Sequence, residues 1–271
     1  MGSIPFAFPG FHGATRRLVL VNLAAYFALL IAGFALPGAT NAVAVHLVFD
    51  PYAFLHGEFW QPLTYSLVHP GLYGPLFELL SLWFMAGFLE GFHNENWVLG
   101  LYAVSVLGTA LAALALYAVA NALAPSLLGA PIPLAGCFGG IFGMLVAIGV
   151  LYGDTQFLLF LLPMGIKARY MVAVYALITV ALLFGQQRIY AFAQLGGALA
   201  GWAFVRLAPR RGLPFQFSEG WYGLRNRYYR WKRRRAARKF EVYMHKQGRT
   251  VRFDGQGHLI DEDADDKKRW N

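Results

Sequence analysis

The sequence predicts an all-α polytopic membrane protein, a bundle of six transmembrane helices followed by a basic C-terminal tail. Of its 271 residues, 58% are hydrophobic and 14% are charged, whereas soluble domains have about 25% charged residues. Long apolar segments recur as far as residue 207. The charge is also segregated. Residues 1–205 contain five Lys/Arg and six Asp/Glu, and residues 206–271 contain the other 18 Lys/Arg and eight Asp/Glu.

Six segments are candidate membrane spans, because a helix crosses about 30 Å of hydrocarbon with about 20 residues. They are Leu18–Ala35, Leu72–Phe92, Trp97–Leu123, Gly136–Leu151, Tyr170–Phe184 and Ile189–Leu207. The first segment is longer than the apolar core of a signal peptide, so we expect a retained helix. The apolar segment 157–166 is short and contains Pro163, and we interpret it as interfacial or as an extension of a neighbouring helix. We therefore expect an N-terminal segment (1–17), a membrane domain (18–207) and a tail (208–271).

The distribution of Lys and Arg predicts the orientation, since these residues accumulate on the cytoplasmic side. The predicted loops 36–71 and 124–135 contain neither residue type, whereas the N-terminus, the loop 152–169 and the tail all contain them. We expect both termini to be cytoplasmic, in a multi-pass protein of a bacterial inner (cell) membrane. The aromatic residues of loop 36–71 favour a position in the membrane interface.

Small residues recur at helical spacing in two of the predicted spans. Three Gly-xxx-Gly pairs occur, namely Gly136/Gly140, Gly139/Gly143 and Gly197/Gly201. Such pairs allow helix backbones to approach closely in lipid. We therefore expect the fourth and sixth spans to take part in close helix packing.

The segment from Gly136 to Gly139, read as Gly-Cys-Phe-Gly, resembles the Gly-x-Ser-Gly stretch of the rhomboid intramembrane serine proteases. Four stretches, one of which includes this segment, carry the resemblance in the order found in rhomboids. They are Trp60–His69, Leu76–Phe84, Gly136–Gly143 and Gln194–Gly201. Together they imply a rhomboid-like core over about residues 18–207.

The resemblance also implies that the catalytic positions have changed. The serine position of the family is Phe138 here, and the histidine position is Gln194. Phenylalanine has no nucleophilic atom and an amide is not a general base. The two side chains that stabilise the oxyanion in the family correspond to Gly74 and Glu78. We therefore assign no catalytic residue, and we predict that the chain is not an enzyme.

Glu78 is the residue of this set with a charged side chain. A carboxyl group in the middle of a span is costly and usually faces the interior of the bundle. The resemblance places it in the former active-site cavity, facing Phe138 and Gln194. Three interpretations remain open. They are a hydrogen bond to Gln194 that ties two helices together, a client contact or proton-linked role, and catalysis. We expect Cys137 to be buried and inert, and His69 to be an interfacial cap.

The tail contains the sequence RNRYYRWKRRRAARK over residues 225–239. A basic, aromatic segment beside a membrane favours anionic lipid. The candidate lipid-binding residues are Arg225, Arg227, Arg230, Lys232, Arg233, Arg234, Arg235, Arg238 and Lys239. A simple topological signal is the alternative, and nucleic-acid binding is less favoured because no binding module is recognisable.

The sequence thus predicts a rhomboid-like membrane pseudoprotease that binds transmembrane clients or partner subunits without cleaving them. Two alternatives remain open. One is an intramembrane serine endopeptidase of the rhomboid family with unrecognised chemistry. The other is a structural subunit of a larger membrane complex. We predict no metal site and no cofactor.

Overall fold

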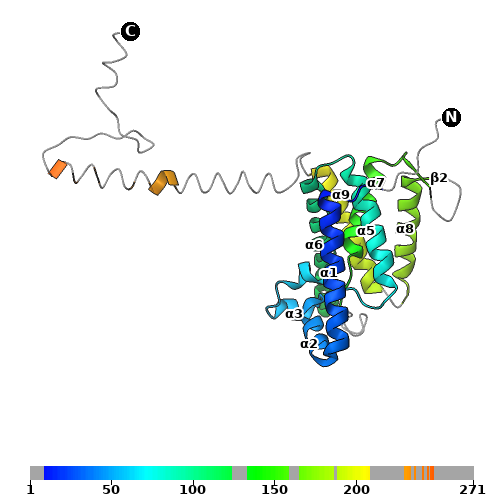
Figure 1. Ribbon diagram of the computed structural model, residues 1–271, viewed down its shortest axis with the longest axis horizontal. Helices are drawn as coiled ribbons and strands as arrows, with labels where there is room; N and C mark the ends of the chain where they lie inside the picture. The colour runs from blue at the N-terminus through cyan, green and yellow to red at the C-terminus, as the bar shows by residue number, and fades with distance from the viewer. Residues whose placement is uncertain are drawn as a thin grey trace, which may run out of the picture. The chain divides into compact units, whose positions relative to one another are not determined.

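The computed structural model describes residues 9–123, 133–158, 165–185 and 188–207, together with separate residues between 229 and 246. The first four ranges form an all-α bundle with one small β-hairpin (Figure 1). The long helices run side by side along the bundle. They are α1 (Gly13–Ala35), α5 (Gly74–Glu90), α6 (Glu95–Leu123), α7 (Phe138–Leu151), α8 (Ala168–Leu182) and α9 (Arg188–Leu207).

These six helices lie at the six predicted apolar segments, and the all-α prediction is confirmed. Within the described residues, α1 and α6 are long and apolar enough to cross a membrane, and α7 and α8 are shorter apolar helices. The number of helices that span the membrane therefore stays a prediction. Lipid requires every backbone group to be satisfied inside the segment, which explains why apolar length alone predicted these helices well.

The N-terminus of α1 is held by a carboxyl group from the end of α5. Glu90 accepts hydrogen bonds from the backbone N–H groups of Ala14 and Thr15 at 2.9 Å, and from the Thr15 hydroxyl at 2.5 Å. The first N–H groups of a helix have no partner within the helix, so a carboxylate there satisfies both the hydrogen bonds and the helix dipole. This contact fixes α1 against α5.

Close backbone contacts join α6, α7 and α9 at the centre of the bundle. A Cβ atom at Gly201 would lie 2.5 Å from Gly143 Cα, and one at Gly197 would lie 2.8 Å from Gly139 O. These helices can pack at this distance only because the four positions lack side chains. The prediction from the glycine spacing is confirmed for α7 and α9.

The predicted loop 36–71 forms four short helices at one end of the bundle (Figure 1). They are α2 (Pro37–Leu47), α3 (Pro51–Leu55), α4 (Gln61–Thr64) and the 3₁₀ turn η1 (Tyr65–Leu67). Tyr65 is buried and donates its hydroxyl to Val106 O at 2.8 Å. Its carbonyl accepts the Gly136 N–H at 3.0 Å. The end of this segment is therefore built into the bundle, directly beside the start of α7.

The hairpin consists of β1 (Gln156–Leu158) and β2 (Gly165–Lys167), which pair antiparallel. The alternative that segment 157–166 extends a neighbouring helix is therefore wrong at both of its ends, and the interfacial alternative stays a prediction. The hairpin lies between α7 and α8 in the chain. Phe157 of β1 is buried, and its ring packs against Phe88 of α5. Residues 159–164 lie outside the described residues. The tail belongs to a separate unit, Pro214–Asn271.

Candidate functional site

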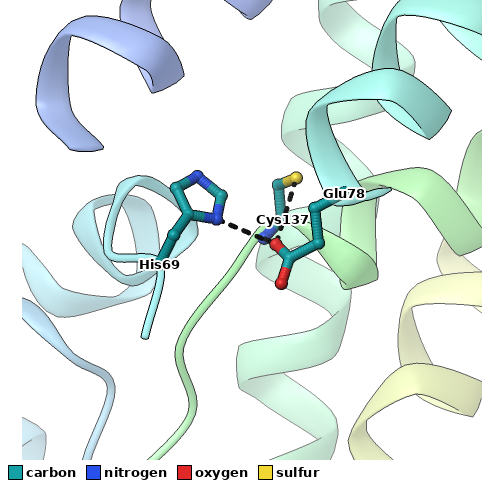
Figure 2. A group of neighbouring side chains, drawn as sticks. All are labelled: His69, Glu78 and Cys137. Carbon is teal, nitrogen blue, oxygen red and sulfur yellow. Dashed lines mark hydrogen bonds and ion pairs between the residues drawn. The ribbon is translucent and has the colours of Figure 1, made fainter. Parts of the chain in front are cut away.

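A buried carboxylate from the second turn of α5 organises the candidate site. Glu78 is 5% exposed, and its Oε2 atom accepts hydrogen bonds from two residues (Figure 2). His69 Nδ1 lies at 2.8 Å and the Cys137 backbone N–H at 3.0 Å. The Cys137 thiol also points at this oxygen, with Sγ at 3.5 Å. The prediction that Glu78 faces the interior of the bundle is confirmed.

The backbone before α7 allows the carboxylate to come this close. Gly136 has a φ of +92°, a conformation that residues with a side chain rarely adopt. A Cβ atom at this position would lie 2.8 Å from Glu78 Oε2. The glycine therefore serves two purposes, turning the chain into α7 and leaving room for the carboxylate beside the Cys137 N–H.

His69 lies between Glu78 and an amide on α1. Its Nε2 atom is 3.1 Å from Asn22 Oδ1, and Asn22 Nδ2 donates to Leu18 O at 2.8 Å. Because the amide nitrogen faces a carbonyl, the amide oxygen faces His69, and Nε2 must carry a proton. The imidazole and the Glu78 carboxyl therefore share a second proton between Nδ1 and Oε2.

The prediction of His69 as an interfacial cap is wrong, because its side chain is fully buried. The segment Tyr65–Pro70 turns into the bundle instead of lying on its surface. The hydrogen bond predicted between Glu78 and Gln194 is also not formed in the described structure, where the carboxyl group is bonded to His69 and Cys137. The start of α7 lies beside Glu78, and the Cys137 N–H there donates to its carboxyl group.

The other positions singled out by the resemblance lie on α5, α7 and α9. Gly74 is the exposed first residue of α5, one helical turn before Glu78, and a Cβ there would meet open space. Phe138 is the first residue of α7 and packs half-buried against the core. Gln194 lies half-buried on α9. The structure thus places Glu78 next to the residue before Phe138.

Sequence reasoning missed Asn22 and Tyr102. Asn22 is 1% exposed in the middle of an apolar segment, and a polar residue at such a position needs a partner. That signal was available in the sequence. The ring of Tyr102 lies so close to Gly140 that a Cβ there would collide with it. Its buried hydroxyl has no hydrogen-bond partner among the described residues.

The cluster combines three chemically different ligand types. His69, Glu78 and Cys137 each offer one atom, and these atoms lie within 4.8 Å of one another. Within the described residues, this is the group arranged so that it can hold a metal ion. It does not resemble a nucleophile with its base, since the thiol points at a carboxylate that is already bonded to two other donors.

A cavity of about 660 Å³ lies between α1, α2 and residues 68–72. Most of its lining is apolar, and His69 and Ala135 are among the lining residues. The cavity therefore reaches the edge of the His69–Glu78–Cys137 cluster from the side of α2.

Three of the predicted lipid-binding residues fall on described positions of the tail. Arg230, Lys232 and Arg235 are helical and exposed, and the Arg235 guanidinium lies 5.4 Å from the centre of the Trp231 ring. The remaining predicted positions lie outside the described residues. They are Arg225, Arg227, Arg233, Arg234, Arg238 and Lys239.

Residues 18–212 match the model of a family described as eukaryotic integral membrane protein (DUF1751). No curated protein matches the chain. The match covers most of the chain and corrects the predicted location, because a eukaryotic family excludes a bacterial inner membrane. Apolar length and Lys/Arg bias follow the same physics in every membrane, so they gave no information about the organism.

Proposed function

The chain belongs to a family of eukaryotic integral membrane proteins, and within it we propose a rhomboid-like protein that binds membrane-embedded segments of other proteins without cleaving them. The observation that carries the non-cleaving part is the Glu78 carboxylate on the Cys137 N–H. Acyl transfer builds an oxyanion beside the nucleophile, and backbone N–H groups stabilise it. At the start of α7 that N–H already binds an anion.

A second negative charge at this point would be repelled by Glu78. The electrostatic cost adds to the loss of chemistry, because Phe138 offers no nucleophile and Gln194 offers no base. Removing a single oxyanion donor costs about 10²- to 10³-fold in rate. A carboxylate at this place raises the energy of the oxyanion instead of lowering it. We therefore expect no slow residual proteolysis either.

The binding part is supported by the way α5 and α8 are held. α5 packs against α1 and α7, and α8 packs against α7 and α9. Of the 15 residues of α8, Ala168 and Thr179 are buried. α5 exposes Leu76, Phe77 and Leu80. A loosely packed α8 and the exposed apolar residues of α5 suit the reversible entry of another transmembrane helix.

Site-specific photocrosslinking in eukaryotic cells tests this proposal. The photoreactive residue is placed at Phe77 on α5 or at Leu177 on α8, each 70% exposed, and at Leu111 on α6, 63% exposed, as a matched lipid-facing control. We expect discrete crosslinked membrane proteins from positions 77 and 177 and none from 111. Equal, diffuse crosslinking at all three positions would show that these faces contact lipid alone.

The two alternatives give different results in the same cells. An intramembrane serine endopeptidase would be labelled by a fluorophosphonate probe and would cleave a transmembrane substrate. A structural subunit would yield the same crosslinked partner at stoichiometric ratio, and that partner would copurify after gentle solubilisation. A client-binding protein yields substoichiometric partners that remain intact.

A further inference from the structure

The His69–Glu78–Cys137 cluster has the features of a metal centre. We propose that His69 Nδ1, a Glu78 carboxylate oxygen and the Cys137 thiolate bind one divalent transition-metal ion, for which zinc fits the donor set best. Zinc prefers nitrogen, sulfur and carboxylate oxygen in tetrahedral geometry. This site is independent of whether the protein binds client helices.

The distances between the donor atoms suit such an ion. Zinc bonds of 2.0–2.3 Å place tetrahedral ligand atoms about 3.3–3.6 Å apart. Glu78 Oε2 lies 3.5 Å from Cys137 Sγ and 2.8 Å from His69 Nδ1. The three donor atoms all lie within 4.8 Å of one another. The distance between Glu78 Oε2 and His69 Nδ1 has to increase by about 0.5 Å to reach the spacing of zinc ligands. A small rotation of either side chain is enough for this.

The charges also balance in the apolar interior. Without metal, the His69–Glu78 pair with its one shared proton and a protonated thiol have no net charge. A divalent ion takes the place of that shared proton and of the thiol proton, so two protons leave to solvent as the bonds to the metal form. The resulting carboxylate, thiolate and neutral imidazole neutralise the ion. The exchange therefore adds no net charge to a buried site, where a net charge would be costly.

Outer interactions hold each ligand in the orientation that a metal needs. A ligating histidine almost always donates its other N–H to a neighbouring acceptor. Asn22 Oδ1 accepts from His69 Nε2 at 3.1 Å, and Leu18 O fixes that amide. The Cys137 N–H in turn holds Glu78. The hydrogen bond from Nε2 to Asn22 thus directs Nδ1 toward the position of the metal.

Three protein ligands leave the fourth tetrahedral position of the ion to water, as in other zinc sites with three protein donors. The ring of Tyr102 lies close to the cluster, because it packs on Gly140, one turn along α7 from Cys137.

The test uses full-length protein in detergent, stripped with chelator and then loaded with Co²⁺ as a spectroscopic substitute for zinc. The chain has a single cysteine, so a cobalt–thiolate charge-transfer band has to come from Cys137. We expect this band at one equivalent, its displacement by Zn²⁺, and one zinc per chain by elemental analysis. We also expect zinc to raise the Tm of the stripped protein.

Variants locate the ion. Cys137→Ser and His69→Gln should lose the bound zinc, and Asn22→Ala should weaken its affinity about 10- to 100-fold. His56→Gln, at an exposed histidine hydrogen-bonded to a backbone carbonyl, should bind as the wild type does. If a variant fails to fold, the wild-type cobalt spectrum and Tm shift still decide. Zinc retained in Cys137→Ser, or a wild-type chain with neither band nor Tm shift, overturns the proposal.

Discussion

Glu78 Oε2 accepts a hydrogen bond from the backbone N–H of Cys137 at 3.0 Å, which joins the second turn of α5 to the start of α7 across 59 positions of sequence. The bond places a negative charge beside Phe138, at the position that the rhomboid resemblance assigns to the nucleophile. It also orients the carboxylate toward His69. One hydrogen bond therefore bears on both proposals, because it opposes an oxyanion and preorganises a set of metal ligands.

Restoring the nucleophile and the base alone should not produce a protease. We expect the double variant Phe138→Ser, Gln194→His to leave a transmembrane reporter substrate uncut, because Glu78 still occupies the Cys137 N–H. Adding Gly74→His and Glu78→Asn replaces the carboxylate with two donors, and a Cβ at position 74 has open space around it. Any cleavage should appear only in the quadruple variant, measured by immunoblot in reconstituted vesicles.

Cleavage by the double variant would show that Glu78 does not block the oxyanion position. A double variant that also carries Glu78→Gln separates charge from shape, since the amide keeps the volume and removes the negative charge. If charge is the main obstacle, this triple variant should resemble the quadruple variant more than the double.

Gly136 should be much less tolerant of a side chain than Gly74. Gly136→Ala places a Cβ 2.8 Å from Glu78 Oε2 in a backbone with φ of +92°. A strained backbone conformation of this kind costs about 1–3 kcal/mol by itself, and displacement of Glu78 adds to that. We expect a clear fall in Tm by scanning fluorimetry in detergent.

Gly74→Ala is the matched control, because it lies at the exposed start of the same α5 helix with nothing within 4 Å of its Cβ. It should change the free energy of unfolding by no more than about 0.5 kcal/mol. Equal Tm values for the two variants would mean that Glu78 is not held against Gly136.

The helices could be predicted from the sequence, whereas most contacts of the candidate site could not. The helices of the bundle follow from apolar length, since Trp97–Leu123 was predicted and α6 is Glu95–Leu123. The same reasoning identified Glu78 as interior, because a carboxyl group exposed to lipid is costly. Glycine spacing also identified α7 and α9 as helices that pack closely, although not as partners of each other. These properties are local, and each depends on one segment at a time.

The partners of Glu78 could not be predicted in this way. His69 is buried because the 3₁₀ turn η1 and residues 68–70 fold inward, and Tyr65 anchors that turn through Val106 on α6. No periodic pattern marks so short a segment. The choice of Cys137 N–H over Gln194 depends on the rotation of α5 relative to α7, which only the assembled bundle determines. Asn22 was accessible to sequence reasoning as a polar residue inside an apolar segment, but its partner was not.

The contact between α7 and α9 should be sensitive to a single methyl group. Gly201→Ala places a Cβ 2.5 Å from Gly143 Cα, so the two helices have to separate. Overpacking of this kind costs about 1–3 kcal/mol. Gly33→Ala on α1 is the matched control, because its Cβ would lie 4.0 Å from Thr40 Cγ2. The control should be neutral or slightly stabilising, as alanine favours helix. Similar Tm values for both variants would contradict the packing described here.

The basic tail should bind anionic membranes through its charge. Residues 206–271 contain 18 Lys/Arg and eight Asp/Glu, and each basic residue near an anionic surface contributes about 1 kcal/mol. Arg230, Lys232 and Arg235 are exposed in helical parts of the tail. Neutralising all three to Gln should therefore weaken binding of a 209–271 peptide to phosphatidylserine vesicles by about 3 kcal/mol, or about a hundredfold.

Vesicle cosedimentation across a salt series measures this, because exposed charges are screened within about 10 Å at 0.1 M salt. Vesicles of phosphatidylcholine alone are the control and should bind the peptide weakly at every salt concentration. Equal binding to both vesicle types, or binding that does not fall with salt, would mean that Trp231 and the other aromatic residues hold the tail to the membrane rather than its charge.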